Sequence, residues 1–201
     1  MTDFTEVLEK TYNITFRRDL VDVTKDAVKS ETLKLHLIDF FPKDHFEIGV
    51  EFSESLAVQQ YEYAATIPRL RQLDYIRKVT VDSSAAGFTA GNFFQIITPA
   101  QALDRYNTQK ENVAYQSGLA INLRSSEAFT NVLVGCFRYP DTTEATYSSW
   151  IADETIELVA LSAAYRVLLL TGERRAAAIQ ADIQQFWLPA LLANIGTTSA
   201  V

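Results

Sequence analysis

Residues 45–52 read His-Phe-Glu-Ile-Gly-Val-Glu-Phe, and the spacing of apolar residues changes at this stretch. Phe46, Ile48, Val50 and Phe52 alternate with polar or small neighbours. Side chains of a strand point alternately to its two faces, so this alternation predicts a strand with one buried face. Apolar residues before it and near the C-terminus instead recur every three or four positions, which is helical spacing. The chain is therefore predicted to be α+β, with strands between two helical ends.

Two helices are predicted ahead of this strand. Asp3 is followed three residues later by Glu6, the spacing of a capping box that opens a short helix. Asp19 is predicted to be the N-cap of a longer helix that reaches about Phe41. Pro42 ends that helix, because the residue before a proline disfavours the helical conformation.

Further strands are predicted in the middle of the chain, from alternation and from β-branched and aromatic content. They cover Leu56–Tyr63, Leu73–Val81, Phe93–Ile97, Leu119–Leu123 and Asn131–Tyr139. The last of these is apolar on both faces and is predicted to be the most buried strand. Residues 82–87 have the composition of a turn, and residues 99–106 are predicted to form one or two helical turns.

Helical spacing returns after residue 149. Ser149 is a suitable N-cap, and Gly172 is predicted to end this helix in the left-handed conformation. A second helix follows so closely that the two helices are predicted to be antiparallel. Pro189 lies within that second helix and is predicted to kink or restart it.

The terminal helices are predicted to pack together, because neither pair has enough apolar surface to be stable alone. The predicted helical base comprises residues 1–42 and 150–195, arranged as a four-helix bundle. Residues 43–149 are predicted to form an antiparallel β insertion. Residues 196–201 are predicted to form a flexible C-terminal tail.

Composition and charge exclude several classes of protein. The 201 residues carry a net charge of −7 without a basic region, so non-specific binding of duplex DNA is not expected. The single cysteine, Cys136, cannot form an intrachain disulfide, which favours a reducing compartment. No apolar run reaches the roughly 18 residues of a bilayer span, and the acidic N-terminus lacks a secretory signal. The sequence predicts a soluble protein made in the cytoplasm.

Known catalytic motifs are missing from the sequence. There is no Gly-rich phosphate loop, no Gly-x-Ser-x-Gly, no His-Glu-x-x-His and no second cysteine for a zinc site. A metal site with two histidines can be drawn from His36, Asp39, Asp44 and His45. The simpler interpretation is a histidine at a helix end and a solvated histidine on a strand. We therefore predict a protein that is not an enzyme, with no catalytic residues, no cofactor and no metal.

Three other groups have both a structural and a chemical interpretation. Cys136 lies in an apolar segment, where a thiol is usually a small buried side chain, and catalysis would need a neighbouring histidine. Ser125 and Ser126 can cap a turn, or one of them can be a nucleophile. Asp153 and Glu154 are adjacent on a helix and point to different faces, which makes them a poor acid–base pair.

Aromatic residues are common at the ends of the predicted elements and are candidates for a protein interface. Rigid side chains with an apolar body and a polar group frequently anchor interfaces, and packing in the core or at its rim is the alternative. The candidate interface residues are Tyr139, Tyr147, Trp150, Trp187, Gly196 and Val201.

A resemblance to a known family rests on six segments spread over most of the chain. They are Arg17–Val21, Leu33–His36, Phe40–Asp44, Leu119–Ser126, Val132–Pro140 and Tyr147–Ala152. Together with the helices divided at Gly172, they resemble the head-to-tail adaptor proteins of tailed bacteriophages. These are the connector, or tail tubular protein A-like, proteins of short-tailed phages. The shared motifs are structural rather than chemical.

The resemblance implies a structural virion protein located in the neck. Such adaptors form a ring, commonly of twelve subunits, beneath the portal protein, and join it to the nozzle or tail tube. They help to retain the genome and then channel it during ejection, so DNA passes through the lumen without sequence-specific binding. They can also offer attachment points for tail fibres. The family has no catalytic residues to carry over, and only residues 196–201 remain here for a C-terminal extension along the portal.

Two other functions are compatible with the residues. The first is a non-enzymatic recognition module that binds carbohydrate or protein, suggested by tyrosines on the predicted strands. The second is a hydrolase or metal-dependent enzyme built on His36, Asp39 and His45.

Overall fold

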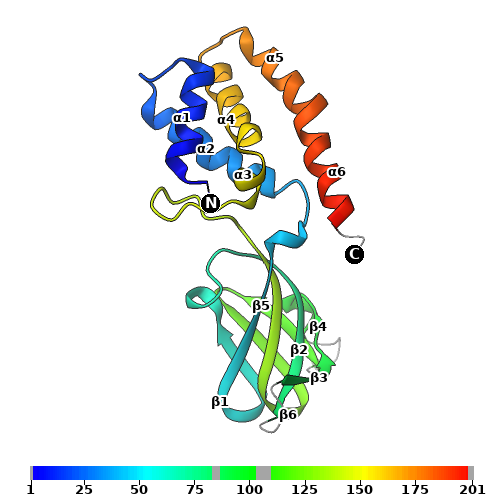
Figure 1. The fold of residues 1–201 in the computed structure, drawn as a ribbon. Helices are drawn as coiled ribbons and strands as arrows, with labels where there is room; N and C mark the ends of the chain where they lie inside the picture. Colours follow the sequence, from blue (N-terminus) through cyan, green and yellow to red (C-terminus); the bar gives the residue numbers. More distant parts are fainter. Residues whose placement is uncertain (1, 83–86, 103–109, 199–201) are drawn as a thin grey trace. The chain divides into compact units, whose positions relative to one another are not determined.

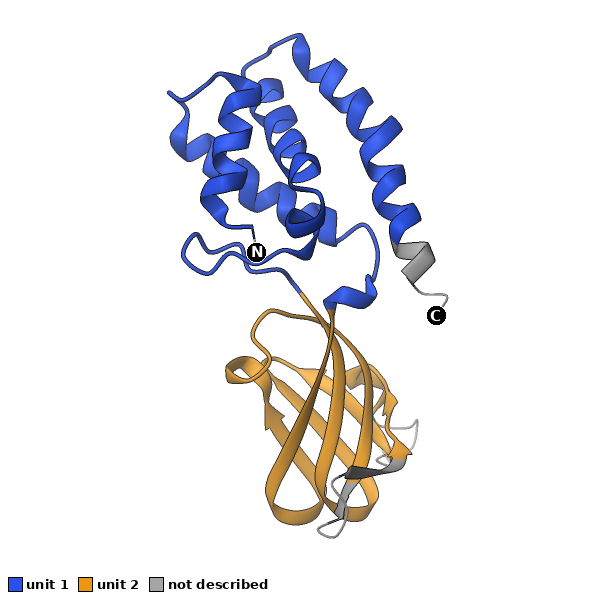
Figure 2. Cartoon of the chain, in the orientation of Figure 1, with its two compact units in different colours: residues 1–44, 139–201 blue, residues 45–138 orange. Residues whose placement is uncertain are grey.

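The chain forms two compact units, shown in different colours in Figure 2. The residues described by the computed structural model are 2–82, 87–102 and 110–198. The helical unit comprises residues 1–44 and 139–201, and the sheet unit comprises residues 45–138, so the protein is α+β. Residues 139–149, predicted to belong to the β insertion, group with the helical unit because Tyr147 packs into its core.

The helical unit is built around one buried helix, α4 (Figure 1). Its elements are α1 (Phe4–Thr15), α2 (Val21–His36), η1 (Pro42–Asp44), α3 (Trp150–Glu154), α4 (Ile156–Leu170), α5 (Arg175–Asp182), the π-helical turn η4 (Ile183–Trp187) and α6 (Leu188–Thr198). α4 contacts α1, α2, α3 and α5. Buried side chains cover most of its circumference, among them Leu158, Val159, Ala163 and Val167. A helix that is apolar on all sides must be covered by other elements, so α4 joins N-terminal and C-terminal segments in one core.

The N-cap of α1 is the one that the sequence predicted, and the N-cap of α2 is not. The Asp3 carboxylate accepts a hydrogen bond from the Glu6 N–H at 2.8 Å, and the Glu6 carboxylate accepts one from the Asp3 N–H at 3.2 Å. The predicted capping box is confirmed. The prediction that Asp19 caps α2 is wrong, because the N-cap is Leu20, without a side-chain hydrogen bond. The Asp19 carboxylate instead accepts two hydrogen bonds from the Arg17 guanidinium, each 3.0 Å long.

α2 ends at His36 rather than near Phe41, where the sequence placed its end. The N–H of Leu37 donates to the Lys34 carbonyl at 3.0 Å, three residues back. A bond of this type tightens the final turn and closes the helix.

The single helix predicted between Ser149 and Gly172 is divided into α3 and α4 at Thr155. Ser149 is the N-cap of α3, as predicted, and its Oγ accepts from the Ala152 N–H at 3.2 Å. Both the N–H and the hydroxyl of Thr155 donate to the Ile151 carbonyl, at 2.8 and 2.9 Å. The N–H bond is the last of the α3 ladder, and Thr155 then leaves the helical conformation, with φ −142°.

Gly172 ends α4 in the left-handed conformation, with φ +70°, which confirms the prediction. The Glu173 N–H donates to the Leu168 carbonyl at 2.9 Å, and the Gly172 N–H donates to the Leu169 carbonyl at 3.2 Å. These two bonds are a Schellman motif, which satisfies the last carbonyls of the helix.

Replacement of this glycine by a β-branched residue, Gly172→Val, is expected to lower the free energy of unfolding by about 1–2 kcal/mol. No heavy atom lies within 4 Å of the position that a Cβ would occupy. The cost therefore comes from the positive φ rather than from a clash. Urea denaturation followed by circular dichroism measures it. Gly172→Asn is the control, because asparagine tolerates this conformation, and an equal loss in both variants would contradict the backbone argument.

Pro189 was predicted to kink or restart the helix, and a π-helical turn, η4, ends at Trp187, two residues ahead of it. A proline inside a helix lacks an N–H, and its ring collides with the carbonyl four residues back. The widened turn accommodates this proline, and helix continues into α6. The predicted flexible tail is corrected, since residues 196–198 are the last turn of α6, whereas Val201 lies outside the described residues.

The described residues of the sheet unit form six strands in a nearly closed sheet. They are β1 (His45–Glu62), β2 (Leu70–Asp82), β3 (Gly87–Phe93), β4 (Gln95–Ile96), β5 (Val113–Ser117) and β6 (Ala120–Arg138), with 3-10 turns η2 (Tyr63–Ala65) and η3 (Pro99–Gln101). The order is β3-β2-β6-β5-β4, and β1 also pairs with β6. All pairs are antiparallel except β4 with β5.

The strands are longer than the sequence predicted. The two strands predicted at residues 46–52 and 56–63 belong to one strand, β1, apart from Tyr63, which follows its end. The register between β1 and β6 shifts on either side of Leu56. Segments 119–123 and 131–139 similarly overlap the long central strand β6. The predicted turn at 83–86 and the predicted helical residues 103–106 lie outside the described residues.

The interior of the sheet unit is formed largely by alternate residues of β6. Val132, Val134 and Cys136 are buried, in keeping with the predicted buried strand. Burial raises the pKa of the Cys136 thiol, which disfavours the reactive thiolate. The prediction that Cys136 is a small buried side chain is confirmed.

Candidate interaction surfaces and the buried polar centre of the helical unit

A hydrogen-bonded chain of side chains surrounds His36 at the end of α2. Its Nδ1 lies 2.9 Å from Oδ1 of Asp44, and its Nε2 lies 2.9 Å from Oγ of Ser149. The Trp150 indole Nε1 also donates to Oδ1 of Asp44, at 2.8 Å. A carboxylate oxygen accepts, so the network assigns the donor role to Nδ1 of His36, and the Ser149 hydroxyl can donate to Nε2.

The order Ser149, His36, Asp44 is that of a hydrolase triad, but burial argues for a structural role. His36 and Ser149 are each only 2% exposed, and the Ser149 oxygen also caps α3. A nucleophile must be reached by its substrate, and this hydroxyl is enclosed. The network instead connects the end of α2, the turn η1 and the start of α3.

The alternative metal site is not assembled. Within residues 2–82, 87–102 and 110–198, no three His, Cys, Asp or Glu side chains are grouped to hold a metal ion. Oδ1 of Asp39 accepts from the N–H of Phe40 at 2.7 Å. His45 belongs to the sheet unit, where its Nε2 lies 3.2 Å from Oδ2 of Asp74.

Two of the candidate interface residues face inwards. Tyr147 is 7% exposed, its ring packs edge-on against Phe4, and its hydroxyl lies 2.9 Å from Oγ1 of Thr32. Burial raises the pKa of this phenol. Tyr147 is therefore a core residue, and its prediction as a surface anchor is wrong. Trp150 is partly buried, edge-on to Phe41, with its N–H committed to the polar centre.

Two further candidates, Trp187 and Tyr139, are only partly buried. Trp187 is partly buried and packs against the helical core from η4, and Tyr139 is half-buried after β6. Gly196 lies in α6. Both Trp187 and Gly196 are thus on the long helical segment formed by α5, η4 and α6.

An apolar groove of about 230 Å³ separates the end of α2 from this long helical segment, with α4 beside it. Its lining includes Leu35, Ile38, Tyr165, Ile183, Gln184 and Leu188. Ile38 is 46% exposed. Phe186, in η4, is 66% exposed. We call this cavity the α2–α6 groove.

Polar residues border the groove on one side. Glu31 is an ion-pair partner of Lys34, at 2.6 Å, and of Arg166, at 3.2 Å. The Arg166 guanidinium also donates to Oγ of Ser30 at 2.7 Å. The contacts of Arg166 join α2 to α4 beside the groove.

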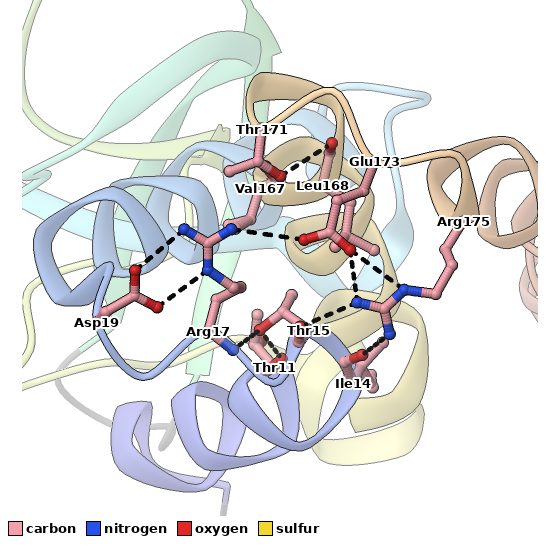
Figure 3. Close-up of polar contacts among 10 residues, drawn as sticks. All are labelled: Thr11, Ile14, Thr15, Arg17, Asp19, Val167, Leu168, Thr171, Glu173 and Arg175. Carbon is pink, nitrogen blue, oxygen red and sulfur yellow. Dashed lines mark hydrogen bonds and ion pairs between the residues drawn. The ribbon is translucent and has the colours of Figure 1, made fainter.

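A separate cluster of ions joins the α1–α2 loop to the turn before α5 (Figure 3). Arg17 lies between Asp19 and Glu173, and Arg175 donates to Glu173 at 2.6 Å and to the Thr15 carbonyl at 3.2 Å. Hydrogen bonds from the two arginines lower the pKa of Asp19 and of Glu173. Exposed pairs contribute little stability, so this cluster positions the start of α5 rather than stabilising it strongly.

No known protein family matches the chain, and no curated protein is significantly similar to it. In the described part of the chain, no helix combines the length and hydrophobicity needed to cross a membrane.

Proposed function

We propose that this chain is a structural virion protein, a ring-forming head-to-tail adaptor that joins the portal protein to the nozzle or tail tube. The observation that supports it most is the α2–α6 groove, a largely apolar surface on the helical unit. In this proposal the terminal helices form the four-helix base of the adaptor, and the sheet unit is its insertion.

Ring formation requires two different surfaces that fit each other, because a self-complementary surface gives a closed dimer. The groove offers one such surface. Leu169 and Leu170 at the end of α4 are exposed by 58% and 67% and offer a second. Large exposed apolar side chains of this kind commonly mark interaction sites. We propose that these leucines of one subunit enter the groove of the next, in a homo-oligomer of about twelve copies.

The charge of the chain fits a channel for DNA. With a net charge of −7, a lumen lined by this protein would repel phosphates rather than bind them. DNA would then leave without being held during ejection. The proposal places the protein in the virion neck, with the portal, the tail protein and tail fibres as partners, after synthesis in the host cytoplasm and without catalysis or a cofactor.

Purified protein is expected to form rings, or to be monomeric until it meets the portal protein encoded with it. Light scattering after size exclusion and negative-stain images, each with and without that portal, test this. Ile38→Asp introduces a charge into the groove and is expected to weaken subunit or portal association at least about tenfold. Val21→Asp is the matched control, because Val21 is 45% exposed at the start of α2 and does not line the groove.

Two outcomes contradict the proposal. One is the absence of both rings and a portal complex. The other is an association that Ile38→Asp and Val21→Asp affect equally, because the groove would then be no part of the contact.

A further inference from the structure

Four aromatic rings lie on the outer face of the sheet unit, one from each of four neighbouring strands. They are His45 on β1, Phe137 on β6, Tyr75 on β2 and Phe93 on β3. His45 pairs with Phe137 in register, and the next outward position of β6, Gly135, pairs with Tyr75. Interior residues such as Val134 and Cys136 alternate with these positions, which places the rings on the opposite face.

Gly135 allows the Tyr75 ring to lie flat on the sheet. A Cβ at Gly135 would meet three adjacent ring atoms, Cδ1, Cε1 and Cζ, all closer than 3.0 Å. Cδ1 and Cζ are nearly equidistant from that position, at 2.7 and 2.8 Å, so the glycine lies beneath the face of the ring. The opposite face of the Tyr75 ring is directed outwards.

The other three rings extend this flat surface and border it. The His45 ring is within 28° of parallel to Tyr75, with centroids 6.0 Å apart. Phe93 stands at 75° to Tyr75 and Phe137 at 74° to His45, with centroids 5.8 and 5.3 Å apart. Tyr75 and His45 thus form a floor, and Phe93, which is 61% exposed, stands steeply against it. We call these four residues the aromatic face.

Carboxylates accompany the rings. The Tyr75 hydroxyl donates to the carboxylate of Glu47, which is exposed. Asp74 is exposed on the solvent side and its Oδ2 lies 3.2 Å from Nε2 of His45. These oxygens retain further lone pairs and can accept hydrogen bonds from a ligand.

The rings and carboxylates of this face can be compared with what three classes of ligand require. Arg77, in register with Phe93, is a basic residue on this face, but a nucleic acid would also bring phosphates against Glu47 and Asp74. A protein interface of ordinary size covers about 800 Å² per partner, and its centre is poor in Asp and Glu. A saccharide matches the aromatic face, since the C–H side of a pyranose packs on a flat ring and its hydroxyls donate to carboxylates.

We propose that the aromatic face is a saccharide-binding site, in which a pyranose ring packs on Tyr75 and His45 and donates hydroxyl hydrogen bonds to Glu47 and Asp74. The site does not depend on the adaptor role, because it lies within the sheet unit alone. It would let the protein recognise a glycan whether or not it forms a ring.

The test uses the full chain and defined probes: maltohexaose, cellohexaose and chitohexaose. Isothermal titration calorimetry and saturation-transfer NMR are expected to detect millimolar binding of at least one. Phe93→Ala is expected to weaken that binding at least about tenfold, because it removes an exposed ring from the site. Asp74→Asn is expected to weaken it less. Leu119→Ala is the matched control, since Leu119 is 66% exposed elsewhere in the same unit.

Tryptophan fluorescence is a poor probe here because both tryptophans lie in the helical unit. Melting temperatures of the variants must match that of the wild-type protein, which separates loss of a contact from loss of the fold. Three results would overturn the proposal: no signal with any of the three probes, equal binding by Phe93→Ala and Leu119→Ala, or preference for an oligothymidylate over every saccharide.

Discussion

Gly135→Val is expected to lower the free energy of unfolding of the sheet unit by about 2–3 kcal/mol. The new side chain would begin inside the space of the Tyr75 ring, which lies flat against the glycine. The ring cannot move freely, since its hydroxyl is bonded to Glu47 and Phe93 packs against it. Chemical denaturation followed by circular dichroism gives the change in stability.

A double-mutant cycle separates this clash from a general intolerance of side chains at residue 135. Gly135→Ala alone is expected to cost about 1–2 kcal/mol, whereas the same change in a Tyr75→Ala background is expected to be nearly neutral. A coupling energy near zero would contradict the assignment, because it would mean that Tyr75 does not occupy the space above Gly135.

Gly135 also illustrates what the sequence could not reveal. In the segment Val-Leu-Val-Gly-Cys-Phe it reads as one small residue within a buried strand. Its importance comes from Tyr75, which lies on another strand in register with it. Register between distant strands depends on the whole sheet, so an alternation of apolar residues cannot specify it.

Sequence patterns that involve only neighbouring residues predicted the structure better than they predicted strand register. The alternation at residues 45–52 predicted a strand that is present, and the capping residues Asp3, Ser149 and Gly172 lie where expected. Each of these depends on neighbours within a few positions. Predictions failed where a distant partner decided the outcome. Arg17 pairs with Glu173, from the other end of the chain, and also binds the Asp19 carboxylate, which therefore does not cap α2.

The candidate site was predicted less well than the fold. Tyr147 has the composition of an interface anchor, yet it bonds to Thr32, 115 positions earlier in the chain. The α2–α6 groove combines residues from both ends of the sequence, and periodicity alone cannot distinguish a buried helix face from a groove wall. The aromatic face combines residues of four strands and has no local motif.

Asp44→Ala is expected to be the most destabilising change in the helical unit, at about 3–5 kcal/mol. It removes the acceptor for two donors, Nδ1 of the buried His36 and Nε1 of the partly buried Trp150. The His36 donor would lose this hydrogen bond in an enclosed site. Asp26→Ala is the matched control on an exposed part of α2 and is expected to change stability by less than about 0.5 kcal/mol.

Asp44→Asn distinguishes the hydrogen bonds from the charge. The amide oxygen can still accept from both donors, but the amide nitrogen must take the place of Oδ2, which is buried without a hydrogen-bond partner among the described residues. We expect Asp44→Asn to lower the free energy of unfolding by about 1–2 kcal/mol, which is less than Asp44→Ala and more than Asp26→Ala. Urea denaturation monitored by tryptophan fluorescence measures the stability of Asp44→Ala, Asp44→Asn and Asp26→Ala. If Asp44→Ala proved no more destabilising than Asp26→Ala, the hydrogen bonds around His36 would not hold α2, η1 and α3 together. The enclosed serine, histidine and aspartate would then need an explanation other than a structural one.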